Sequence, residues 1–93
     1  MNQKTIDIKH AKSLNPIGKR LKSIRNKLEL TQAEVCRETG IPLSSLSDRE
    51  SGVRTTFIEE YLVLANYFNE EWKKKFPYEI KRITVTYIMF GVE

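Results

Sequence analysis

The chain has 93 residues, and its 40% of hydrophobic residues are enough for the core of one small domain. A single cysteine excludes an intramolecular disulfide, one histidine argues against a structural metal site, and no run of eighteen apolar residues is present to span a membrane. The net charge of +4 favours a polyanionic partner, nucleic acid first, although an ordinary charge excess explains it equally well.

Residues 1–13 are polar and lack the apolar core of a secretory signal, so we expect a flexible N-terminal arm. The absence of a signal and of disulfides fits a reducing cytoplasm, which is the expected location. Residues 14–93 are then the folded domain.

Asn15 and Pro16 predict the start of the first helix, with asparagine as N-cap and proline in the first turn. Apolar residues follow at helical spacing on one stripe: Ile17, Leu21, Ile24 and Leu28. The residues between them give this helix a basic outer face: Lys19, Arg20, Lys22, Arg25 and Lys27.

The second helix begins at Thr31, because Thr31 and Glu34 have the spacing of a capping box. Gly40 ends it, since glycine readily takes the left-handed conformation found after a helix. Only two residues then precede the third helix, which we expect over residues 43–51, with Gly52 as its stop.

A second capping box, Thr56 to Glu59, predicts a fourth helix with an apolar face. Asn69 is expected to interrupt it, and residues 70–76 are expected to form a short extra helix that ends at Pro77. Four aromatic residues of this region and the closing segment are assigned to the core or, alternatively, some of them to an exposed dimer surface: Trp72, Phe76, Tyr78 and Tyr87.

The closing segment has two interpretations. Thr84 and Gly91 can bound a short helix, whereas the β-branched and aromatic residues of "ITVTYIMF", residues 83–90, also suit a strand.

Two helices joined by a turn of about three residues that contains glycine form a helix-turn-helix. Close crossing of the helices needs a small residue four positions after Gln32, and Cys36 stands there. The tight turn needs Gly40, and Leu46 inserts into the core from the centre of the third helix.

The stretch from Thr31 to Gly52 resembles the phage repressor and Cro-type, or XRE-like, helix-turn-helix family. The matching residues are Thr31, Gln32, Glu34, Cys36, Gly40, Ile41, Ser44, Ser45, Leu46, Ser47, Glu50, Ser51 and Gly52. The resemblance covers about residues 16–91. It implies an all-α, five-helix, repressor-like domain that binds operator DNA as a homodimer, and it favours a fifth helix over a strand.

The resemblance also assigns roles to individual residues. Leu43, Ser44 and Asp48 are expected to face base edges. Leu43 can pack on a thymine methyl group, Ser44 can donate or accept a hydrogen bond, and Asp48 can accept one from the amino group of a cytosine. The remaining DNA-contacting residues are expected to meet the backbone: Gln32, Ser45, Ser51 and Arg54. The alternatives are local packing for Leu43 and a solvated side chain for Asp48.

In this family an arginine at the position of Arg25 pairs with the glutamate at the position of Glu50. The resemblance therefore ties Glu50 to the first helix. It assigns attraction to phosphate to the first helix, to the turn from Gly52 to Arg54 and, if they are not simply solvated, to Lys73, Lys74 and Lys75. Residues 69–83 look like an insertion before the last helix.

We expect a DNA-binding transcription regulator, most simply a repressor. The sequence has no nucleophile paired with a base, no phosphate-binding glycine loop and no metal cluster. We therefore expect that the protein is not an enzyme and that it uses no cofactor or small-molecule substrate. The chain fits a compact regulator, an antitoxin-type autorepressor or the N-terminal part of a longer protein. The alternative is a module that binds a protein such as RNA polymerase, which the nearly neutral third helix allows.

Overall fold

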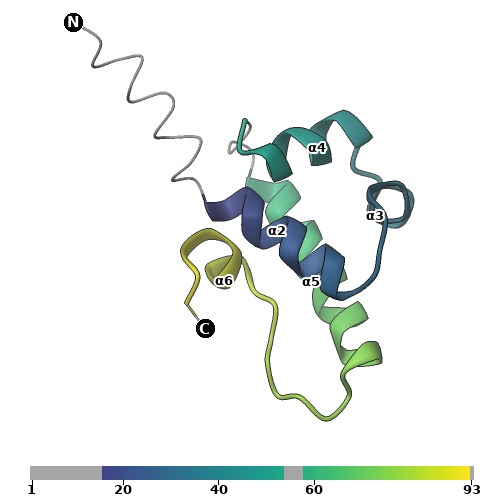
Figure 1. The fold of residues 1–93 in the computed structure, drawn as a ribbon, viewed down its shortest axis with the longest axis vertical. Helices are drawn as coiled ribbons and strands as arrows, with labels where there is room; N and C mark the ends of the chain where they lie inside the picture. The colour runs from purple at the N-terminus through teal and green to yellow at the C-terminus, as the bar shows by residue number, and fades with distance from the viewer. Residues whose placement is uncertain (1–15, 54–57, 93) are drawn as a thin grey trace, which may run out of the picture.

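The computed structural model describes residues 16–53 and 58–92, and the helices within these ranges form one bundle (Figure 1). They are α2 (Pro16–Lys27), α3 (Gln32–Thr39), α4 (Leu43–Ser51), α5 (Ile58–Lys75) and α6 (Val85–Phe90). The described residues contain no strand, which confirms the all-α prediction and the helical interpretation of the closing segment. The predicted N-terminal arm and the capping box at Thr56 lie outside these residues.

The core is built from one face of each helix. The predicted stripe of the first helix points inward, with Leu21, Ile24 and Leu28 buried, and Leu46 enters the core from α4 with no exposed surface. α2 packs against α4 on one side and α6 on the other, and α5 packs against α3 and α6 (Figure 1). The helix-turn-helix formed by α3 and α4 therefore lies on one side of α2.

Local signals set the start of α3 and the ends of α3, α4 and α6 as predicted, whereas Asn15, the predicted N-cap of the first helix, lies outside the described residues. The side chains of Thr31 and Glu34 each accept a hydrogen bond from the other residue's backbone N–H, at 3.0 and 2.8 Å, and complete the capping box. Gly40, Gly52 and Gly91 follow α3, α4 and α6 with positive φ angles of 80°, 85° and 73°. These three glycines end their helices in the left-handed conformation, in which glycine avoids the steric penalty of a Cβ.

A close contact that the sequence analysis missed lies between α2 and α4. A Cβ added to Gly18 would stand 2.3 Å from the carbonyl oxygen of Glu50 and 2.5 Å from that of Arg49. The backbone of α4 thus rests directly on α2, and only glycine permits this approach.

The predicted break at Asn69 is wrong, because α5 continues without interruption to Lys75. Its buried residues Phe68 and Trp72 extend one apolar face across the break, and this packing outweighs the weak helix propensity of asparagine. The Asn69 side chain instead accepts a hydrogen bond from the Ile83 N–H at 3.1 Å. The separate helix predicted over residues 70–76 is likewise the end of α5.

Residues 76–84 connect α5 to α6 without a regular element. Tyr78 in this connector is 98% exposed, so it is not part of the core. Thr84 caps α6 as predicted by accepting from the Tyr87 N–H, and Arg20 of α2 donates to the Ile88 and Met89 carbonyls near the end of α6. No helix in the described part of the chain has the length and low polarity needed to cross a bilayer.

Candidate nucleic-acid interface

The third predicted helix, α4, has an inner and an outer face. The inner face holds four buried residues: Ser45, Leu46, Arg49 and Glu50. Leu43 is 54% exposed, Ser44, Ser47 and Ser51 are also exposed, and Asp48 is half-buried. All three residues expected to read bases therefore lie on the outer face or at its edge: Leu43, Ser44 and Asp48.

One carboxylate fixes the α2 and α3 side of α4. Arg25 donates from Nε and Nη2 to the two carboxylate oxygens of Glu50, at 2.7 and 3.0 Å, and the expected pair is present. Gln32 donates to the same carboxylate at 3.0 Å, and Arg25 also donates to the Leu30 carbonyl at 2.9 Å. The hydrogen bond to Glu50 raises the pKa of Arg25 above its already high usual value, so this guanidinium stays charged.

A second carboxylate fixes the α5 side of α4. The Oε1 atom of Glu60 accepts hydrogen bonds from the Ser45 hydroxyl at 2.6 Å and from Arg49 Nε at 2.7 Å. The fully buried Arg49 guanidinium also lies 4.6 Å from the centre of the Tyr61 ring, a cation–π distance. Glu60 thus completes a pair of anchors that hold α4 from opposite sides.

This arrangement argues against the expected backbone contact of Ser45, because its hydroxyl is bonded to Glu60 and only 5% of the residue is exposed. Glu60 was not among the residues expected to support α4. The available signal was the spacing of Ser45 and Arg49, which are one helical turn apart and so share a face of α4.

Burial of Arg49 leaves the outer face of α4 without a cationic side chain. Asp48 is the ionisable residue nearest that face, and the Ser51 hydroxyl donates to the Asp48 carbonyl at 3.0 Å. Attraction to a polyanion must therefore originate elsewhere on the molecule. Arg54, expected to supply part of it, lies outside the described residues.

The lysines at the end of α5 are paired with carboxylates. Lys73 lies 3.5 Å from Glu70, Lys74 lies 2.9 Å from Glu71, and Lys75 lies 2.5 Å from Glu29. These pairs are exposed and individually weak, but they offset the positive charge of this surface. The end of α5 is therefore a poorer phosphate-binding surface than its three successive lysines indicated.

The structural residues of the helix-turn-helix occupy their expected places. Cys36 is half-buried and packs against the core, and burial raises the pKa of its thiol. A raised pKa lowers the thiolate fraction at neutral pH, which suits a packing role better than a reactive one. Across residues 16–53 and 58–92 no group of three histidine, cysteine, aspartate or glutamate side chains is placed to hold a metal ion.

Comparison with protein families supports the same arrangement. A family model described as Helix-turn-helix matches residues 21–73, more than half of the chain. The match extends past Asn69 into the C-terminal part of α5, in keeping with the continuous helix. Searches of curated proteins and of solved structures give no match. The chain belongs to the helix-turn-helix family of the XRE and Cro type, a family of DNA-binding regulators.

Proposed function

We propose that the protein is a sequence-specific, DNA-binding transcription regulator, most simply a repressor, and that α4 reads the major groove. The observation that carries the proposal is the anchoring of α4 by two carboxylates, Glu50 and Glu60, which leaves its polar face outward. A helix held in this way presents its side chains to base edges in a defined orientation.

The proposed base contacts use the exposed side of α4. Leu43 packs on a thymine methyl group, Ser44 donates to or accepts from a base edge, and Asp48 accepts from the amino group of a cytosine. Each contact between a side chain and the correct base contributes about 1–3 kcal/mol of discrimination when its geometry is good.

Contacts to the DNA backbone are proposed for Gln32, Ser51 and Arg54. Gln32 is the first residue of α3, where the helix dipole favours an anion. Its amide nitrogen carries two hydrogens, and one bond to Glu50 leaves the second to donate to phosphate. Glu50 thereby orients a phosphate-binding side chain as well as α4.

We also propose that the regulator acts in the cytoplasm as a homodimer on two half-sites. In helix-turn-helix dimers the half-sites are about one turn of DNA apart, or roughly 34 Å. A symmetric operator would then mirror the two-fold symmetry of the dimer.

One observation favours a second function, a module that binds another protein. The outer face of α4 carries no cation, while Asp48 stands at its edge and Leu43 is largely exposed. A face without cations suits a protein partner such as RNA polymerase better than the basic face of most recognition helices does.

A salt titration with random-sequence duplex DNA separates the two functions. A DNA-binding protein should bind at low salt and lose affinity steeply as salt rises, with a slope of about −0.9 for each phosphate contacted. Absence of binding at low salt would contradict the DNA-binding proposal and favour the interaction module.

A further inference from the structure

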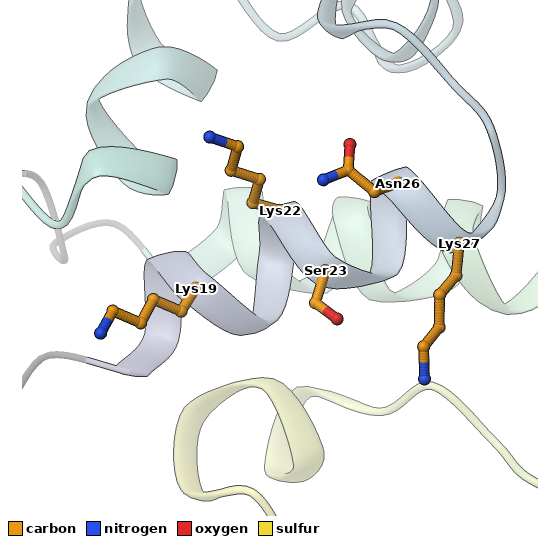
Figure 2. A pocket seen from close by; sticks show the side chains of 5 residues that line it. All are labelled: Lys19, Lys22, Ser23, Asn26 and Lys27. Carbon is orange, nitrogen blue, oxygen red and sulfur yellow. The ribbon is translucent and has the colours of Figure 1, made fainter.

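The outer face of α2 carries a shallow, wide-open basic groove of about 430 Å³ (Figure 2). Its lining side chains recur at helical spacing on the side of α2 opposite the core: Lys19, Lys22, Ser23, Asn26 and Lys27. The lining carries three ammonium groups, one hydroxyl and one amide, which fan out along the outer face of α2, and it contains no carboxylate. We call these five residues the α2 groove.

Within residues 16–53 and 58–92, no ion pair offsets the charge of the α2 groove. No ion pair joins Lys19, Lys22 or Lys27 to a carboxylate among the residues that the structure describes, unlike the lysines that end α5. On the α4 side, Glu50 is already engaged by Arg25 and Gln32. On the other side, α6 has the sequence VTYIMF and contributes no acidic residue.

The α2 groove lies beside the helix proposed to read DNA. Gly18, next to Lys19, brings α2 into contact with the last residues of α4. In Figure 2 Lys22 and Asn26 extend toward the side on which α3 and α4 lie, and Ser23 and Lys27 toward the side of α6. Of the three lysines, Lys22 is therefore best placed to contact the DNA strand that flanks the segment proposed to be read by α4.

The composition of the groove indicates its ligand. Ammonium, hydroxyl and amide groups all donate hydrogen bonds to phosphate oxygens, and such contacts position a protein on DNA. The lining has no aromatic or aliphatic residue of the kind that anchors a protein partner. A phosphodiester backbone therefore fits this face better than an acidic protein segment does.

We propose that the α2 groove is a second phosphate-contacting surface, which takes the backbone of DNA flanking the segment that α4 reads. This inference rests on the proposed function. It also accounts for how a recognition helix without an exposed cation is held on DNA, since phosphate contacts supply most non-specific affinity. The groove would thus provide attraction, and α4 the discrimination.

Two variants of equal charge test the inference. The first replaces Lys19, Lys22 and Lys27 with glutamine, and the control makes the same change at Lys73, Lys74 and Lys75. Both remove three charges from exposed sites, and a thermal melt of each verifies that the fold is retained. Each protein is then titrated with salt on a duplex that extends a full helical turn beyond the site bound by the parent.

The slope of the logarithm of affinity against the logarithm of salt should fall in magnitude by about 2 to 3 in the groove variant, because three phosphate contacts contribute roughly 0.9 each. The slope of the control should stay close to that of the parent. Equal slopes for all three proteins, or an equal loss in both variants, would overturn the groove while leaving DNA binding by α4 intact. A parent that binds no duplex at low salt would overturn the proposed function as well, so the two failures are distinguishable.

Discussion

Replacing Arg25 with alanine should destabilise the domain more than any other single change to a charged residue of α2. The substitution removes two hydrogen bonds from the Glu50 carboxylate and one from the Leu30 carbonyl. The Glu50 side chain is only 4% exposed, so the carboxylate left behind is poorly solvated. Gln32 remains as a donor to Glu50 and limits the damage.

The magnitude follows from this burial. Removing one partner of a buried ion pair costs about 3–5 kcal/mol, because the other charge is left uncompensated. The 12% exposure of the Arg25 side chain and the remaining Gln32 bond place the expected cost near the lower limit, at about 3 kcal/mol. In a domain of this size each kcal/mol lowers Tm by roughly 4–8 °C, so Tm should fall by about 12–24 °C.

Thermal and urea unfolding of three proteins measure the effect. The control is Arg37→Ala, since Arg37 lies 3.6 Å from Glu38 and both side chains are more than half exposed. It should cost at most about 1 kcal/mol, as surface pairs do. The double variant Arg25→Ala/Glu50→Gln should regain part of the loss by removing the buried charge. An Arg25→Ala melt that matches the parent or the Arg37→Ala control would refute the reasoning.

Two further predictions concern helix contacts. Gly18→Ala should lower the free energy of unfolding in urea by about 1–3 kcal/mol, although alanine has the better helix propensity, because its Cβ meets two backbone carbonyls of α4. The control is Ser23→Ala at an exposed position of the same helix. A Gly18→Ala variant more stable than the parent would contradict the close approach. The backbone hydrogen bond from Thr31 lowers the pKa of Glu34 below its ordinary value of 4.5, so the stability that this carboxylate contributes is complete above pH 4.5 and lost as pH falls. The stability difference between the parent and Glu34→Gln should therefore be larger at pH 7 than at pH 3, and a difference independent of pH would contradict this account.

The helix boundaries could be predicted because their causes are local. A threonine with a glutamate three residues later, and a glycine at a helix end, act within a few residues of one another. The structure confirms these signals at Thr31, Gly40, Gly52 and Gly91. The Arg25–Glu50 pair joins distant residues, and it was expected from family resemblance rather than from spacing.

The features that could not be predicted depend on how the helices pack. Glu60 interacts with Ser45 and Arg49 only because the start of α5 lies against the inner face of α4. Gly18 looked like an ordinary glycine within a helix, since the carbonyls it approaches belong to another element. Asn69 was expected to break the helix on propensity, but the buried face of α5 continues through it.

The central claim is that the outer face of α4 reads base sequence, and selection of bound DNA from a random pool tests it most directly. The parent should enrich a symmetric pair of half-sites. Ser44→Ala and Asp48→Ala should each change the preferred base at one position of the half-site, whereas Arg54→Ala should weaken binding to all sequences alike. Enrichment of the same sequence by the parent and by both α4 variants, or of no sequence by the parent, would contradict the claim.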